Sequence, residues 1–272
     1  MKYIIPALTL LLFVSCENVK ENNPISSDIS NMLQHAEWID LTFDFDENSI
    51  YWPTNVPFSH DTVSYGITDK NYFYSSFKFA AEEHGGTHFD APIHFSANKN
   101  TIEKVPLSEL HGPGVIVDVS EKALNNPDYL IRIDDFQEWE SRNGRIPDGA
   151  VVLVHTGYSR YYNSREKYLG TNLTGTEAVP HLHFPGLDPE AAKWLSEERN
   201  IVGFGLDTPS IDYGQSSDFM VHRILFEKGL TGYENVANLD KLPEKGAYII
   251  ALPMKIKGGS GAPLRIVAIL NK

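Results

Sequence analysis

Apolar positions along the chain fall into short runs that are separated by turn residues. Five of these runs are enriched in β-branched and aromatic residues, a pattern typical of strands buried on one or both faces. They span residues 115–119, 151–155, 201–206, 248–252 and 264–270. The sequence therefore predicts a sheet of short buried strands.

Helical patterns are fewer. The first covers residues 134–143. The second begins with Asp188 as its N-cap and Pro189 at its first helical position. The third covers residues 218–228 and is followed by Gly229. Strands and helices do not alternate regularly, as they would in a Rossmann sheet or barrel. We predict an α/β domain with more strand than helix.

The first sixteen residues have the pattern of an export signal. One lysine precedes an apolar run, residues 3–14, that is too short to span a bilayer as a mature helix. Ser15 and Cys16 follow, and this context resembles the cleavage box of bacterial lipoproteins. We predict an exported, membrane-anchored lipoprotein on the periplasmic side or cell surface, with Cys16 as the lipid anchor. A plain signal peptide with a chance cysteine is the alternative.

Residues 17–35 are polar, rich in Asn and Ser, and without an apolar period. We interpret them as a tether behind the anchor. The sequence from about Trp38 onward contains no internal repeat and no second linker rich in proline and glycine. Residues 36–272 are therefore expected to form one domain.

Charge and cysteine content exclude several classes of protein. The formal net charge is −13 and no cluster of lysine and arginine offsets it, which argues against a nucleic-acid partner. Cys16 is the only cysteine, so the chain cannot form an internal disulfide or a thiolate metal cluster. Contact with a membrane is expected only through the lipid anchor.

Residues 84–95, HGGTHFDAPIHF, concentrate metal-ligand side chains. His84, His88, Asp90 and His94 have the same parity, so an extended strand would present them on one face. Imidazole and carboxylate ligands suit Zn²⁺, Mn²⁺ or Fe²⁺ and leave positions open for water. The pattern predicts a catalytic metal site on a strand.

This segment matches the motif H-x-G-T-H-x-D-x-P-x-H, the signature of the cyclase family, which includes bacterial kynurenine formamidases and isatin hydrolases. The resemblance continues through WIDLT, HFPGLDPEAAKWL, GFGLDTPSID, VHRILFEKGLTGYEN and GAPLRIVAI, and covers nearly all of the chain from about Trp38 onward. It implies a cyclase-like (swivelling β/β/α) fold, a single domain with a mixed, curved β-sheet and a few helices.

The resemblance also implies a set of metal ligands. In formamidase-type members two ions are bound, and the matching residues here are His84, His88, Asp90 as the bridge, His222 and Glu234. Isatin-hydrolase-like relatives have one manganese ion and lack the final carboxylate. Glu234 therefore favours a site with two ions, zinc first and manganese as the alternative.

Three further residues are candidates for contact with a substrate. His94 belongs to the motif but not to the implied ligands, so we assign it the role of general acid–base, with an ordinary pKa near 6.5. Trp52, with Tyr51 beside it, resembles the family aromatic that lines the substrate pocket. Ordinary core packing is an equal alternative for either ring.

The implied function is hydrolysis of an aryl formamide, similar to N-formylkynurenine, by a metal-activated hydroxide that releases formate. The substrate class is thus a small aromatic amide, and the resemblance implies a homo-oligomer, dimer or tetramer. The export signal argues against a role in tryptophan catabolism, which is normally intracellular. Three alternatives remain: a hydrolase of isatin-like cyclic amides or lactones with one manganese ion, a cupin-type iron oxygenase, and a non-catalytic surface binding protein.

Other ligand-type residues are interpreted as structural. His181 and His183 precede a predicted helix in a loop, and His155 ends an apolar run, so we leave all three out of the site. Asp207 and Asp212 either orient a metal ligand or accept hydrogen bonds from turn amides.

Overall fold

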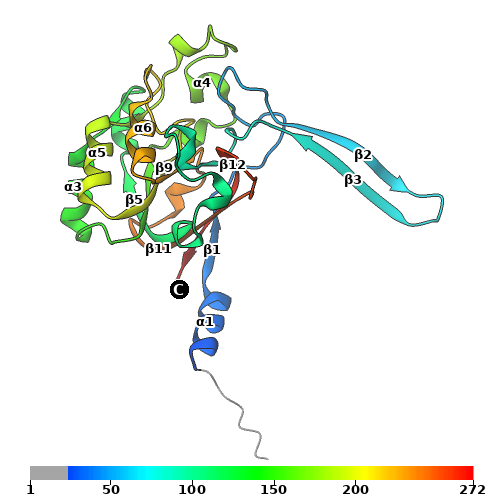
Figure 1. The fold of residues 1–272 in the computed structure, drawn as a ribbon, viewed down its shortest axis with the longest axis horizontal. Helices are drawn as coiled ribbons and strands as arrows, with labels where there is room; N and C mark the ends of the chain where they lie inside the picture. The colour runs from blue at the N-terminus through cyan, green and yellow to red at the C-terminus, as the bar shows by residue number, and fades with distance from the viewer. Residues whose placement is uncertain (1–23, 272) are drawn as a thin grey trace, which may run out of the picture. The chain divides into compact units, whose positions relative to one another are not determined.

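Eight strands in the described part of the chain form one mixed sheet in the computed structural model, which describes residues 24–271 (Figure 1). The chain divides into two compact units, 1–35 and 36–272, and the sheet belongs to the second. In spatial order its strands are β1 (Glu37–Asp40), β12 (Gly261–Leu270), β11 (Lys245–Pro253), β5 (His111–Asp118), β7 (Ala150–His155), β9 (Ile201–Leu206), β10 (Thr231–Glu234) and β4 (His88–Asp90).

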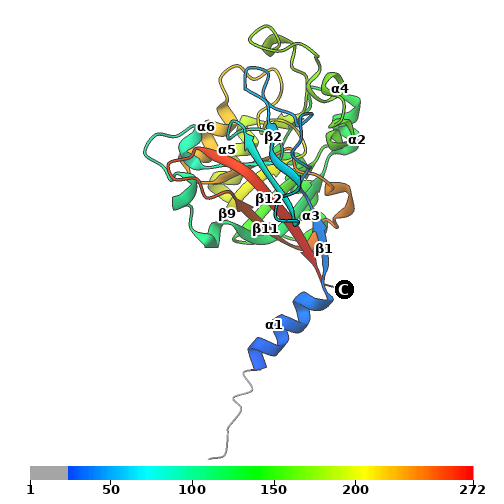
Figure 2. The ribbon, with the colours of Figure 1, turned by 90° about the vertical axis from the view of Figure 1, so that its right-hand side faces the viewer.

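Strand β12 closes the sheet into a ring, because it pairs with β4 as well as with β11. The neighbouring strands β5, β7, β9 and β10 are parallel, and the other pairs are antiparallel. Figure 2 shows β11 and β12 side by side. The prediction of an α/β domain with a mixed, curved sheet is confirmed.

Helices cover one face of the parallel strands. In Figure 1, α3 (Ile133–Asn143), α5 (Pro189–Glu198) and α6 (Met220–Glu227) lie on the same side of the sheet. Val115 of β5 packs in a core with these helices, whereas Ile116 packs in a second core with residues of the other ring strands. Because both faces are buried, these strands have the continuous apolar runs seen in the sequence.

The predicted elements are present with small shifts at their ends. All five predicted runs are strands, and residues 201–206 agree with β9 at both ends. Helix α6 begins at Met220 rather than at Asp218, because Phe219 has a left-handed backbone with a φ of 51°. The short elements that were not predicted include α2 (Ser120–Asn125), α4 (Arg165–Leu169), β6 (Leu130–Ile131) and β8 (Gly186–Leu187), as well as the edge strand β1 and the strand β10.

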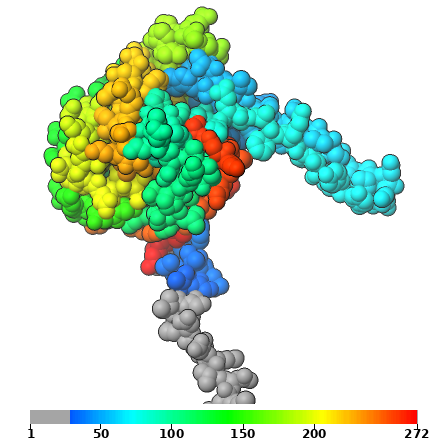
Figure 3. Space-filling view, in the orientation of Figure 1, coloured from blue at the N-terminus to red at the C-terminus, as the bar shows by residue number. Residues whose placement is uncertain are grey.

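A long hairpin that the sequence analysis did not predict projects from the ring. Its strands are β2 (Ser59–Ile67) and β3 (Phe73–Ala80), which pair antiparallel with each other in a separate two-stranded sheet. Figures 1 and 3 show the hairpin extending away from the rest of its unit.

The segment predicted to be a tether contains a helix, α1 (Pro24–His35). No helix is expected there from the sequence, because residues 17–35 lack an apolar period. Of the described helices, none has the length and apolar character needed to cross a membrane. The predicted signal peptide and its Cys16 lie outside the described residues, so export and lipid anchoring remain predictions.

Candidate metal centre

Because β4 lies between β10 and β12, the part of the 84–94 motif on β4 lies next to residues that are distant in the sequence. In the register of these strands, His88 lies opposite Glu234 of β10, and Asp90 lies opposite Gly232 of β10 and Gly261 of β12. All of these positions are buried. Closure of the ring therefore places an imidazole and two carboxylates next to one another inside the fold.

The prediction that one strand carries the whole motif is wrong. Only His88 and Asp90 lie on β4, while His84 precedes the strand and His94 ends a short 3-10 helix, Pro92–His94. Gly86 interrupts the strand because its φ of 58° lies in the left-handed region. The motif histidines nevertheless meet, since the rings of His84 and His94 stack with their centroids 3.7 Å apart.

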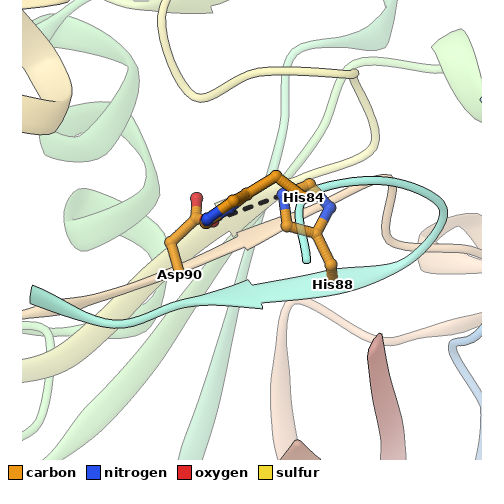
Figure 4. A group of neighbouring side chains, drawn as sticks. All are labelled: His84, His88 and Asp90. Atoms are coloured by element: carbon orange, nitrogen blue, oxygen red, sulfur yellow. Dashed lines mark hydrogen bonds and ion pairs between the residues drawn. The ribbon is translucent and has the colours of Figure 1, made fainter. Parts of the chain in front are cut away.

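Two clusters of ligand atoms share Asp90. His84, His88 and Asp90 form the first, with 2.6 Å between His84 Nδ1 and Asp90 Oδ1 and 3.3 Å between His88 Nε2 and Asp90 Oδ1 (Figure 4). Asp90, His222 and Glu234 form the second, with 3.7 Å from His222 Nε2 to Asp90 Oδ2 and 3.2 Å to Glu234 Oε1. The structure thus brings together the five ligand residues expected from the sequence.

The chemistry of these atoms fits divalent cations. Among the described residues, His88 Nε2 and Asp90 Oδ2 are buried and have no hydrogen-bond partner. Such buried polar atoms are costly unless a ligand satisfies them. Two nitrogen- and oxygen-containing clusters that share one carboxylate would suit a pair of ions such as Zn²⁺ or Mn²⁺.

The contacts behind the ligands fix which ring nitrogen faces the site. His222 Nδ1 donates to Asp212 Oδ2 at 2.6 Å, and His88 Nδ1 donates to the carbonyl of Gly86 at 3.0 Å. The Nε2 atoms of both rings therefore face the clusters and are the atoms that would bind an ion once they lose their protons. The suggestion that Asp212 orients a metal ligand is thus supported by its contacts.

His84 is held by a contact that the sequence analysis missed. The hydroxyl of Ser260 donates to Glu83 Oε2 at 2.8 Å, so it accepts a hydrogen bond from His84 Nε2, also at 2.8 Å. His84 Nδ1 lies 2.6 Å from Asp90 Oδ1 and donates a hydrogen bond to it. Both ring nitrogens of His84 are therefore held, one by Ser260 and one by the carboxylate that the two clusters share. No sequence spacing marks Ser260, because only the fold brings it to His84.

Burial and neighbouring charges set the protonation of the site. Burial is the main cause that lowers the pKa of His94 to about 4; the charge of Asp90 opposes the shift, and the charges of His84 and His222 add to it. His94 is therefore neutral near pH 7, whereas the sequence suggested an ordinary pKa. For His88, burial opposes the charged ring, but the charge of Asp90 and contacts with Glu234 raise its pKa to about 10. The negative charges of Asp90 and Glu234 that raise this pKa would also attract a metal cation.

A cavity of about 290 Å³ opens onto both clusters. Trp52, Phe95 and Phe219 form apolar parts of its wall, and His94 also lines it. Tyr51 is instead buried in the core, where its ring lies against Gly85, so that a Cβ added to Gly85 would come within 2.1 Å of it. Of the two aromatic candidates, Trp52 is thus the one on the cavity wall.

The other histidines and aspartates considered in the sequence form ion pairs or hydrogen bonds with residues that belong to neither cluster. His155 pairs with Asp118 at 3.3 Å, and His183 pairs with Asp128 at 2.8 Å on the surface. Asp207 accepts hydrogen bonds from backbone amides of the turn that starts at Thr156. Asp207 therefore has the second of the two roles considered for it.

Comparison with known families identifies the family of this chain. The sequence model of the Cyclase family matches residues 39–213, more than half of the chain. The chain belongs to the Cyclase family. The resemblance seen in the motif is therefore confirmed.

Three cyclase-family relatives show how far the likeness extends. The chain is 34% identical to an isatin hydrolase of Roseibium aggregatum over 198 residues, which make up 70% of this chain and 73% of that protein. It is 27% identical to a kynurenine formamidase of Bacillus cereus over 235 residues, 86% and 98% of the two chains. The solved structure of isatin hydrolase A from Labrenzia aggregata, bound to benzyl benzoate, superposes with a TM-score of 0.81 at 32% identity, over 92% of this chain and 100% of that one. These relatives are hydrolases.

Proposed function

We propose that this cyclase-family chain is a metal-dependent hydrolase that cleaves the amide bond of a small aromatic compound, with an aryl formamide as the first candidate. One observation carries the proposal. Two clusters of metal-ligand atoms share Asp90 and lie beside a cavity with aromatic walls. Catalytic metal sites combine a ligand set of this kind with access for a substrate.

The chain supplies the ligands and holds them in place. His84, His88 and Asp90 would hold one ion, and Asp90, His222 and Glu234 the other; zinc is the first candidate and manganese the second. Ions bound there would lower the pKa of a bound water and polarise the substrate carbonyl. The hydrogen bonds that His222 and His88 donate to Asp212 and to the Gly86 carbonyl keep the other ring nitrogens directed inward, so little reorganisation is needed when an ion binds.

His94 would move the proton. Its imidazole is neutral near pH 7, so a ring nitrogen can accept a proton from the attacking water. The water oxygen then bonds to the formyl carbon, the bond between that carbon and nitrogen breaks, and His94 returns the proton to the leaving amine. The products are formate and an aryl amine, and His94 ends in its starting state.

Trp52, Phe95 and Phe219 would select the aromatic part of the substrate. The rings of Trp52 and Phe219 meet edge-on with centroids 5.9 Å apart, and Phe95 lies 5.3 Å from Phe219. Such a wall favours a flat ring through stacking and burial of apolar surface. The metal clusters would then lie where the amide carbonyl projects from that ring.

A second candidate substrate is a cyclic amide of the isatin type. The observation in its favour is the higher sequence identity to an isatin hydrolase than to a kynurenine formamidase. The first candidate rests instead on Glu234, which completes a second cluster of ligand atoms.

Parallel assays on N-formylkynurenine and isatin would test the function. We expect metal-dependent turnover of the formamide with release of formate, and a fall in kcat of roughly 10²–10⁴-fold in His94→Ala because a proton transfer is lost. His183→Ala, which changes an exposed histidine paired with Asp128, is the matched control and should keep full activity. Turnover of isatin alone would select the second candidate. A metal-loaded chain with no activity on either substrate would contradict the proposal.

A further inference from the structure

The rim of the cavity beside the metal clusters carries an acidic side chain that the proposed reaction does not use. Glu82 lines the cavity two residues before the predicted ligand His84, and it is exposed to solvent. Among the described residues, no lysine or arginine forms an ion pair with Glu82. A negative charge without a protein counterion therefore lies where a ligand would enter.

Hydrogen bonds hold the segment that carries Glu82 against the turn that carries Trp52. The amide of Val56 donates to Glu82 Oε1 at 2.6 Å, and Asn55 Nδ2 donates to the carbonyl of His84 at 3.3 Å. Within the turn, the amide of Asn55 donates to the carbonyl of Trp52 at 2.9 Å. The carboxylate is thus held at a defined place on the rim, next to the turn that supplies part of the aromatic wall.

The polar atoms that remain free on this rim are hydrogen-bond acceptors. In the described part of the chain, nothing donates to Glu82 Oε2, because Val56 contacts the other oxygen. The side-chain nitrogen of Asn55 is already used, so its oxygen is the atom left to meet a ligand. A primary ammonium group, which combines a positive charge with three N–H donors, is complementary to these oxygens.

The rest of the cavity offers nothing to a negatively charged side chain of a substrate. Of the described residues that line the cavity, none is a lysine or an arginine. Glu234 also lines it, but an ion in the second cluster would neutralise that charge, so Glu82 is the charge that the outer part of a ligand would meet. A carboxylate there would lose contacts with water and gain no cationic partner.

We propose that Glu82 selects positively charged substrates, and that the substrate is an aromatic amide with a side-chain amine and no carboxylate. This role of Glu82 rests on the proposed function, which places the amide carbonyl at the metal clusters and the ring against the aromatic wall. The ammonium group of such a substrate would then meet Glu82 and Asn55 at the rim. Opposite charges at the two ends of the cavity would orient the substrate.

A purely structural role for Glu82 would require only an acceptor for the amide of Val56. Glu82→Gln keeps such an acceptor and removes the charge, so it separates the two roles. Glu103→Gln is the matched control. The carboxylate of Glu103 also accepts a hydrogen bond from a backbone amide, that of Gly258 at 3.0 Å, but Glu103 does not line the cavity.

Isothermal titration calorimetry of the zinc-loaded chain would measure the selectivity. The ligands are three aryl amines of the kind that formamide cleavage releases: kynurenine, its analogue without the carboxylate, which is a cation, and its analogue without the amine, which is an anion. An exposed ion pair and an exposed like-charge contact each change Kd about two- to fivefold. We therefore expect the cation to bind about tenfold more tightly than the anion, with kynurenine between them.

The variants show whether Glu82 causes this preference. In Glu82→Gln the ratio of the two Kd values should fall about tenfold, because both the attraction and the repulsion are lost, whereas Glu103→Gln should keep the wild-type ratio. High salt should reduce the wild-type ratio, since it screens exposed charges. Absence of measurable binding of the cation, equal binding of cation and anion by wild type, or an unchanged ratio in Glu82→Gln would overturn the proposal.

Failure of this selectivity can be told apart from failure of the proposed function, because the amines bind without reacting. A chain that binds the cation selectively but hydrolyses no aryl formamide and no isatin would contradict the proposed function and retain the role of Glu82. A chain that hydrolyses the formamide but binds the three amines equally would retain the function and exclude that role.

Discussion

At the scale of single residues, the hydrogen bonds behind the metal ligands are the least expected part of the site. Asp212 accepts from His222 Nδ1 at 2.6 Å and also from the amides of Val221 and His222. Burial would raise the pKa of Asp212, but the hydrogen bond from His222 outweighs it and lowers the pKa. A charged Asp212 thus keeps the Nε2 atom of His222 directed at the second cluster.

Removing this charge should weaken metal binding. For Asp212→Asn we expect the zinc affinity of the cluster formed by Asp90, His222 and Glu234 to fall roughly 10–100-fold, as is typical when a contact behind a histidine ligand is lost. Competition with a chromophoric chelator would measure this. Asp128→Asn, which removes the same kind of partner from the exposed His183, is the control. Equal affinities in the two variants would contradict the assigned role.

Some residues of the site can be predicted from the sequence, and others cannot. His84, His88, Asp90 and His94 are recognisable because they lie within eleven positions of one another. The contribution of Ser260 is invisible in the sequence, since its contact with His84 spans 176 positions and depends on where β12 meets β4.

At the scale of elements, strands buried on both faces are the ones that the sequence predicts best. β5, β7 and β9 have continuous apolar runs because the helices cover one face and the interior of the ring covers the other. β4 and β10 have only three and four residues, which is too short for a periodic signal. The hairpin of β2 and β3 was missed because many of its apolar residues are exposed, and no core imposes a pattern on them.

One contact between strands should make stability depend on pH. Asp118 of β5 and His155 of β7 are register partners, paired at 3.3 Å. Burial opposes a charged His155, but the hydrogen bond with Asp118 outweighs it and raises the His155 pKa. The hydrogen bond from His155 lowers the Asp118 pKa despite partial burial. The stabilisation from His155 is lost as pH rises through its raised pKa, and that from Asp118 is lost as pH falls through its lowered one.

The pair should therefore stabilise the fold most between about pH 4 and about pH 6.5, the unperturbed values of the two groups. We expect the difference in Tm between wild type and Asp118→Asn to be larger at about pH 5.5 than at about pH 8.5. The effect should stay below about 1 kcal/mol because Asp118 is half-exposed. Thermal unfolding followed by circular dichroism would measure it. A difference independent of pH would contradict the assignment.

At the scale of the whole molecule, ring closure creates the candidate metal centre. Asp90 comes from β4, Glu234 from β10 and His222 from α6, and these elements meet because β4 joins the two ends of the curved sheet. The sequence predicted a mixed, curved sheet only through the family resemblance. Strand order depends on pairings between distant segments, which the pattern of apolar residues does not encode.

The most direct test of the central claim is the number of metal ions bound by wild type and by Glu234→Gln. Each chain would be loaded with zinc, dialysed and measured by plasma mass spectrometry, with Glu197→Gln, an exposed partner of Lys228, as the control. Two ions in wild type and the control, and one in Glu234→Gln, are expected because the variant weakens only the second cluster. One ion in all three chains, or none in wild type, would contradict a two-ion hydrolase.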